Sequence, residues 1–355
     1  MNSKTPAYIL TVTLILAANA HAQETEATPE EGTISAMSTG TEAAPISSIR
    51  TEIKAPKPAP VITAETYGLA DSGKYYSAEN FLEFKQKTGH SVFTALSGRA
   101  VQFRGGEKDY AHFSGNKLLG GVEAQVTPQI NLSGSLGAGK LTVHDSFGKV
   151  FESSRTIPVG EIAVAYSMTN TTKFKLTGSE DFAYMHFETD DRDADVMNLR
   201  KGVIEVDTRF IPKWQLKSTA AFSFYGDGNE RQKHDHMLVR EVVTDPLTLS
   251  AGISGGWRGF KFRSNQYISP EHRENYGLRF IGQKPLTSSW NLEGDVFYGY
   301  DQTRNSKRYN VSNTDIAASY TDKSGWLLRA AATFYTQHNG RFWENSGSLT
   351  LEIPL

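Results

Sequence analysis

Apolar and polar residues alternate with a period of two through most of this chain, and this alternation limits the folds open to it. In the stretch WNLEGDVFYGY the even positions of 290–300 are mostly apolar, whereas the odd positions carry Asn291, Glu293 and Asp295. The closing stretch GSLTLEIPL keeps the pattern as far as Leu355. A period of two is that of a β-strand whose two faces meet different surroundings, so the sequence predicts an all-β protein.

Two β architectures produce such strands, a secreted β-sandwich and an antiparallel barrel that crosses the outer membrane. The connections between the expected strands alternate in length, which favours the barrel, because outer-membrane barrels have short turns at one rim and long loops at the other. The short connections are 127–129, 168–172, 211–213, 244–246, 284–289 and 321–325, and the long ones are 105–117, 144–155, 188–198, 226–235 and 301–310.

Large aromatic residues gather beside the short connections and fall on the apolar parity of their strands. Aromatic side chains at one height on the lipid face form the girdle of a membrane interface. A soluble core gives no reason for such an arrangement. The predicted girdle consists of Tyr166, Phe210, Trp214, Trp290, Tyr320 and Trp326.

The mean hydropathy of −0.43 agrees with a barrel in which one face of each strand meets lipid and the other meets water. Residues 63–355 divided by roughly 18 residues per strand and connection predict about 16 strands, with 14 as the alternative count. An even count brings both chain termini to the same rim, the periplasmic one. GSLTLEIPL is then the last strand, which must pair with the first one to remove the open edges.

The first residues have the composition of a secretion signal, with Lys4, an apolar run at 8–18 and small residues before Gln23. The apolar run is too short to span a membrane. We therefore predict a signal peptide at 1–22 that is cleaved, and localisation in the outer membrane of a Gram-negative bacterium. Residues 23–62 lack aromatic residues and predict a disordered periplasmic linker.

One local motif resembles a known family. The residues Tyr267, Ile268, Ser269 and Pro270 are similar to the tyrosine–aromatic–serine–proline hairpin in the C-terminal barrels of exopolysaccharide export proteins, the cellulose and poly-N-acetylglucosamine secretion type. The opening stretch HSVFTALSGRAVQFRG also suits that group, and the resemblance extends over 73–355. It departs from the family at Ile268, where an aromatic residue is common. The family usually carries a periplasmic tetratricopeptide scaffold before the barrel, where this sequence has only the predicted linker 23–62. For an exporter, the resemblance then implies that the scaffold is a separate protein or is missing.

A water-filled barrel would be lined by the polar parity of its strands. Charged side chains there would offer many weak contacts to a passing solute, and tyrosines would offer stacking faces to sugars. The predicted lumen residues are Lys175, Arg209, Lys217, Arg258, Arg279, Arg329, Glu205, Asp207, Glu293, Asp295, Asp315, Tyr225 and Tyr335.

Two acidic or histidine-bearing stretches invite chemical readings. Asp235 stands between His234 and His236, as in an outer-membrane protease or a metal site, but no second convergent cluster accompanies them. The acidic stretch 188–195 could hold calcium, although it lacks the spacing of a calcium loop. We expect both stretches to be loop charge, and we predict no enzyme activity, no cofactor and no metal.

The net charge of −2 argues against a nucleic-acid partner. The expected partners are outer-membrane lipid and the barrel assembly machinery. Two functions agree with these features. One is an exopolysaccharide export porin, whose further partners would be the polymer and a separate periplasmic scaffold. The other is a passive solute porin or a structural outer-membrane barrel.

Overall fold

The computed structural model describes residues 60–71, 76–89, 91–104, 112–144, 152–182, 197–262, 270–304, 308–337 and 342–355. The elements in these ranges are the strands β1 (Val61–Asp71), β2 (Tyr76–Lys87), β3 (Val92–Arg104), β4 (His112–Gln125), β5 (Ile130–His144), β6 (Glu152–Thr169), β7 (Thr172–Phe182), β8 (Asn198–Ile211), β9 (Trp214–Tyr225), β10 (Glu230–Val243), β11 (Thr248–Phe260), β12 (Arg273–Pro285), β13 (Trp290–Thr303), β14 (Tyr309–Thr321), β15 (Leu327–Gln337) and β16 (Phe342–Pro354). Among the described residues no helix is long and apolar enough to cross a membrane.

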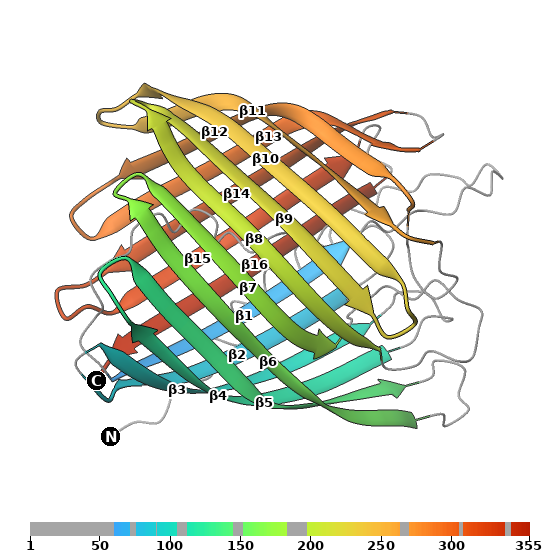
Figure 1. Ribbon diagram of the computed structural model, residues 1–355. Coiled ribbons are helices and arrows are strands. Elements are labelled where there is room, and N and C mark those ends of the chain that lie inside the picture. Colours follow the sequence, from blue (N-terminus) through green and yellow to red (C-terminus); the bar gives the residue numbers. More distant parts are fainter. Residues whose placement is uncertain are drawn as a thin grey trace, which may run out of the picture.

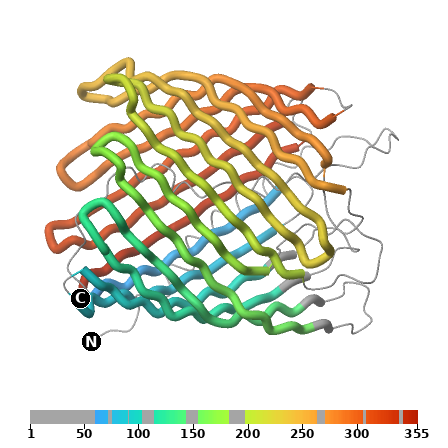
Figure 2. Tube along the Cα trace, in the orientation of Figure 1, coloured from blue at the N-terminus to red at the C-terminus, as the bar shows by residue number. Residues whose placement is uncertain are grey.

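The strands form one closed barrel in which each strand pairs with its neighbours in the sequence and β1 pairs with β16 (Figures 1 and 2). The seam between the first and last strands runs from Val61 opposite Pro354 to Asp71 opposite Glu344. The amide of Leu355 extends it by donating to the carbonyl oxygen of Pro60 at 2.8 Å. The predicted antiparallel barrel of about 16 strands and its closure by GSLTLEIPL are therefore confirmed.

The connections follow the predicted alternation, with tight turns at the rim that carries the C-terminus (Figure 1). Several predicted long loops are wrong in their extent, because β4 begins at His112 within 105–117 and β6 begins at Glu152 within 144–155. The predicted loop 226–235 also differs. β9 ends at Tyr225 and β10 begins at Glu230, and the tight turn between them places Gly228 at a φ of 84°, where glycine is favoured. The charged and polar residues after Gly228 belong to β10, and their polarity made this part of the strand look like a loop in the sequence.

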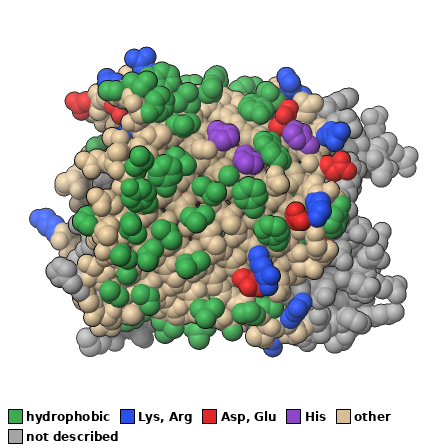
Figure 3. All heavy atoms as spheres, viewed as in Figure 1, with side chains coloured by type: hydrophobic (Ala, Val, Ile, Leu, Met, Phe, Trp, Pro, Cys, Tyr) green, Lys and Arg blue, Asp and Glu red, His purple; other side chains and the backbone are tan. Residues whose placement is uncertain are grey.

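The outward face of the strands is apolar, as Figure 3 shows for one side of the barrel, with charged side chains gathered toward the rim with the longer connections. Leu136 and Ile162, at the middle of neighbouring strands, are 72% and 66% exposed. Large apolar side chains with so much exposed surface are expected only where lipid covers them.

The predicted girdle residues all lie on this outward face at the short-turn rim. The rings of Trp290 and Tyr320 are register partners and lie 5.1 Å apart between centroids. Trp214 is covered on one side by the guanidinium of Arg240, 5.8 Å from its ring centroid. Phe210, Tyr166 and Trp326 are exposed. This placement is that of a girdle at a membrane interface.

Candidate transport channel

Contacts that skip strands identify the inward face of the barrel. Lys117 on β4 places its Nζ 2.6 Å from Oδ2 of Asp181 on β7, across β5 and β6. Arg329 on β15 donates from Nη2 to Oε2 of Glu293 on β13 at 2.8 Å. Side chains of non-adjacent strands can meet in this way only on the concave side, so the parity of these residues faces the lumen.

Strand register extends this assignment around the barrel. Directly opposite residues share a face. The pairs lead without change of face from Glu293 through Gln283 as far as β7, and in the other direction from β13 to β15. The predicted lumen residues lie on the inward parity, with Arg209 assigned from Asp207 two residues earlier, because Arg209 itself falls within an irregularity of the β8–β9 register. They are Lys175, Arg209, Lys217, Arg258, Arg279, Arg329, Glu205, Asp207, Glu293, Asp295, Asp315, Tyr225 and Tyr335.

In the middle of β12 and β13 the inward charges are paired. Arg279 binds Asp295 through two nitrogens, with Nε 2.8 Å from Oδ1 and Nη2 2.6 Å from Oδ2. Asp295 is almost fully buried. A bidentate guanidinium–carboxylate pair holds both groups in a fixed geometry and neutralises them locally. In the Arg329–Glu293 pair beside it the opposite charges likewise neutralise each other.

The charges of β7, β8 and β9 are paired more loosely. Nζ of Lys217 lies 3.8 Å from Asp207, whose Oδ1 also accepts from Nε2 of Gln215 at 2.8 Å. Nζ of Lys175 lies 3.6 Å from Glu205, and both side chains are about half exposed. Such exposed pairs contribute little to stability, and they leave the lumen wall hydrated and polar.

The half of the lumen nearer the long connections contains two apolar clusters. The first joins Met197, Tyr225 and Phe260, with the rings of Tyr225 and Phe260 5.8 Å apart. The second joins Val311, Tyr335 and Phe342 and includes Phe297. Tyr225 and Tyr335 face inward as predicted, but both are buried in these clusters. Their ring faces are therefore used in packing, and the prediction of open stacking faces is wrong.

Sequence reasoning missed the most buried ion pair of the interior. Nε of Arg273 on β12 lies 2.7 and 2.8 Å from the two carboxylate oxygens of Asp301 on β13, and both side chains are almost fully buried. The signal was available, because Arg273 shares the parity of Arg279 in the same strand. It was hidden because β12 begins just after a stretch that resembled a loop.

The family-like motif lies in the connection between β11 and β12. Tyr267, Ile268 and Ser269 lie outside the described residues. Pro270 is buried, and its carbonyl oxygen accepts the amide proton of Phe260 at 3.0 Å. The carbonyl oxygen of the nearby His272 accepts the amide proton of Arg304 at 2.9 Å. The end of this connection is thus tied to β11 and to the end of β13.

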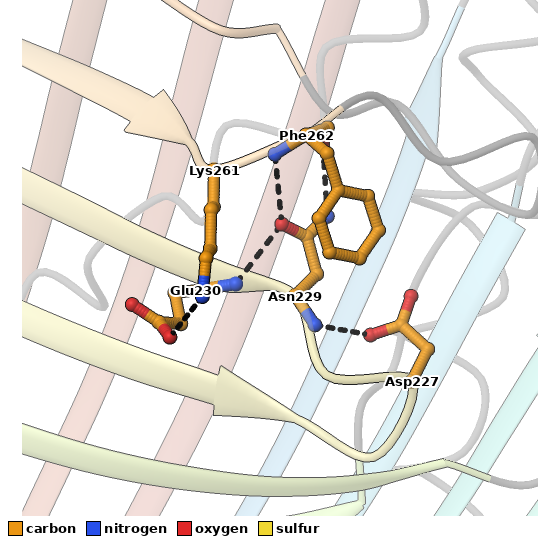
Figure 4. Close-up of polar contacts among 5 residues, drawn as sticks. All are labelled: Asp227, Asn229, Glu230, Lys261 and Phe262. Carbon is orange, nitrogen blue, oxygen red and sulfur yellow. Dashed lines mark hydrogen bonds and ion pairs between the residues drawn. The ribbon is translucent and has the colours of Figure 1, made fainter.

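Its beginning is tied to the β9–β10 turn, as Figure 4 shows. The side chain of Asn229, which is 1% exposed, donates from Nδ2 to the carbonyl oxygen of Phe262 at 3.0 Å and accepts from the amides of Glu230 and Phe262. Oδ1 of Asp227 accepts the amide proton of Asn229 at 2.9 Å. Lys261 and Glu230 form an ion pair at 2.8 Å. The two sides of the motif-bearing connection are therefore fixed.

The histidines of β10 do not form a catalytic or metal site with Asp235. Asp235 faces inward and pairs with Lys233 at 3.0 Å. His234 and His236 face outward, where His234 stacks on Trp257 at 5.0 Å and His236 lies 2.9 Å from Oγ of Ser218. The described ranges hold no group of three or more histidine or carboxylate side chains that could bind a metal. The acidic stretch 188–195 lies outside those ranges.

One further stretch matches a catalytic pattern by letters alone. Residues 252–256 read GISGG, which fits the G-x-S-x-G of hydrolases with a nucleophile elbow. That elbow needs a sharp turn from a strand into a helix, whereas Ser254 lies within β11 and pairs with Gly277 and Met237. The pattern here belongs to a regular strand and carries no catalytic geometry.

Comparison with known proteins supports the fold. No family model and no curated protein matches the sequence. A solved structure described as a bacterial polysaccharide outer membrane secretin matches with a TM-score of 0.64 and 11% identity, covering 83% of this chain and 98% of that one. CdiB from Acinetobacter baumannii matches with a TM-score of 0.52 and 8% identity, covering 83% of this chain and 60% of that one. The chain has the fold of an outer-membrane β-barrel channel, and its barrel resembles the polysaccharide secretin, as the sequence motif implied.

Proposed function

We propose that this protein conducts a secreted polysaccharide across the outer membrane, delivered by a separate periplasmic scaffold protein. The observation that carries the proposal is the inward wall, where charged and amide side chains of many strands face one lumen while the outer wall is apolar. A long polar polymer needs such a wall, because it slides over many weak partners and would be held by one deep site.

The neighbouring fold supports the same assignment. The structural match covers nearly the whole length of the polysaccharide secretin. The Tyr267–Pro270 stretch resembles the export family. At the level of sequence the likeness is low, so the kind of polymer has to be sought in the residues of this lumen.

A passive solute porin is the second candidate. The polar inward wall suits small hydrated solutes equally well. The buried clusters around Phe260 and Tyr335 favour the export channel over a wide diffusion pore, because they place apolar side chains inside the half of the lumen nearer the long connections. On this proposal the signal peptide 1–22 directs export, and the periplasmic partner would be met by the predicted linker that precedes β1.

The test is the amount of secreted polysaccharide per cell in a deletion strain, in the same strain carrying the wild-type gene, and in the parent. Export predicts a loss on deletion and recovery on complementation at matched barrel level. If the deletion strain secretes as much polymer as the parent, export is the wrong function. An ion-conducting pore in lipid bilayers would then support the passive porin.

A further inference from the structure

Three cations form a row across the inward faces of β10, β11 and β12. Lys233 stands opposite Arg258, and Arg258 stands opposite Arg273. Like charges that face each other on neighbouring strands destabilise the sheet. Such a row is stable where anions compensate the positive charges. The ion pairs of each cation therefore show which of the three charges is not compensated.

Two members of the row form ion pairs, and the third, Arg258, forms none with the described residues. Lys233 pairs with Asp235 at 3.0 Å, and Arg273 binds Asp301 through Nε and Nη2. Arg258 is only partly exposed, and it makes no hydrogen bond or ion pair with any residue of the described ranges. This separates Arg258 from Arg279 and Arg329, whose guanidinium groups are occupied by Asp295 and Glu293.

Two buried donor groups of the inward face have no hydrogen-bond partner among the described residues. Arg273 is only 7% exposed, and its buried Nη1 has no hydrogen-bond partner among the described residues. The hydroxyl of Tyr335 on β15 is in the same condition, also at 7% exposure. Tyr335 interacts electrostatically with both Arg258 and Arg273. Unpartnered buried donors are costly and call for an acceptor.

An acceptor-bearing side chain also belongs to the inward face. Glu344 on β16 is register partner to Tyr335, is 3% exposed, and interacts electrostatically with Arg258 and Arg273. It lies too far from either guanidinium to form an ion pair. Arg258, Arg273, Tyr335 and Glu344 thus all lie on the inward parity, and donors of Arg273 and Tyr335 have no hydrogen-bond partner among the described residues.

A sugar acid has the complementary chemistry. Its carboxylate accepts two parallel hydrogen bonds from guanidinium groups, and its hydroxyls donate to a carboxylate. We propose that Arg258, Arg273, Tyr335 and Glu344 together bind a carboxylate-bearing sugar unit of the transported polymer. The proposal deepens the export function and rests on it. The paired wall around Arg279 then provides sliding contacts, and this site recognises the acidic unit.

Isothermal titration calorimetry on the purified full-length barrel in detergent tests the site, whether or not the channel conducts. The probes are an oligogalacturonate, a neutral cello-oligosaccharide of the same length and a sugar phosphate. The wild type is expected to bind the uronate at least about tenfold more tightly than the neutral probe. Arg258→Gln is expected to weaken uronate binding by about tenfold to a hundredfold and to leave neutral binding unchanged.

Arg240→Gln is the matched control. It removes the same charge from β10 on the outward face, against Trp214, and should leave uronate binding unchanged. Because Arg258 makes no ion pair, Arg258→Gln should assemble normally, which heat-dependent gel migration verifies. For Arg273, the double variant Arg273→Gln with Asp301→Asn avoids a buried unpaired carboxylate and should also lose uronate binding.

Equal binding of the uronate and the neutral probe would overturn the site, as would equal losses in Arg258→Gln and Arg240→Gln. Arg258-dependent binding of the sugar phosphate without uronate binding would overturn the assignment to a carboxylate. These results are independent of polymer secretion. A deletion strain that secretes normally refutes export while uronate binding stands, and absent uronate binding with lost secretion refutes the site alone.

Discussion

The two faces of β14 follow different rules within one strand. Ile316 points outward, is 46% exposed and faces lipid. The only requirement at such a position is an apolar side chain. Asp315, the residue before it, points inward and accepts from Nδ2 of Asn313 at 3.2 Å. An outward residue can therefore be exchanged within its class. An inward residue depends on particular partners, some of them on strands that are distant in the sequence.

The largest expected effect comes from opening the barrel at its seam, because an open wall no longer separates an outward face from an inward one. Deleting Glu352–Leu355 removes the seam pairs of Val61, Ile62 and Thr63 and the hydrogen bond to Pro60. Without closure the barrel has open edges in lipid, where unsatisfied backbone groups cost several kcal/mol each, about 2–7. We expect loss of most of the assembled protein from the outer-membrane fraction, measured by immunoblot. Leu355→Phe is the control and should assemble at least as well as the parent, and normal levels of the truncated chain would contradict the role of the seam.

The next effect separates the faces of β14 directly. Ile316→Arg places a charge in the middle of the lipid face and should destabilise the barrel by about 2–4 kcal/mol. Asp315→Asn, one residue away, keeps the inward hydrogen bonding and should cost less than about 1 kcal/mol. Urea unfolding followed by heat-dependent gel migration measures both. Equal costs would mean that the assignment of inward and outward faces is wrong.

A smaller effect sharpens the rule for the inward face. Arg329→Leu leaves Glu293 without its cation and is expected to cost about 1–3 kcal/mol, whereas Leu replacements at both positions should cost less than the sum of the two single changes. The coupling energy from this double-mutant cycle, obtained by the same unfolding measurement, is the readout. Strict additivity of the two single changes would show that the pair does not act as a unit.

The smallest effect concerns a rim turn outside both faces. Hydrogen bonds from Ser324 Oγ at 2.6 Å and the amide of Trp326 at 2.8 Å lower the pKa of Asp322. A lowered pKa in the folded state gives stability that is present above the ordinary carboxylate pKa, about 3.9, and is lost as the pH falls through the folded value. Asp322→Ala should unfold slightly earlier than the parent at pH 7 and together with it near pH 2. A difference that persists at low pH would assign the effect to something other than the carboxylate.

The sequence was sufficient for the barrel because alternation and connection length are local properties. Leu349, Leu351 and Ile353 reveal their face by spacing alone, and Trp290 and Tyr320 reveal their rim by standing next to short connections. The ion pairs could not be predicted in the same way. Arg329 meets Glu293 across β14, and Lys117 meets Asp181 across β5 and β6, and such contacts depend on the curvature of the closed wall. The packing of Tyr225 and Tyr335 into clusters depends on it as well.

The seam between β1 and β16 has a consequence for the order of folding. Every other strand pair joins neighbours in the chain, but this one joins segments separated by nearly the whole barrel sequence. Forming a contact between such distant segments carries a large entropic cost before it is rewarded, so the seam should close last. Until then the nascent sheet presents two unpaired edges that could template aggregation. The interval before closure is therefore the period in which this chain most needs a chaperone to cover these edges.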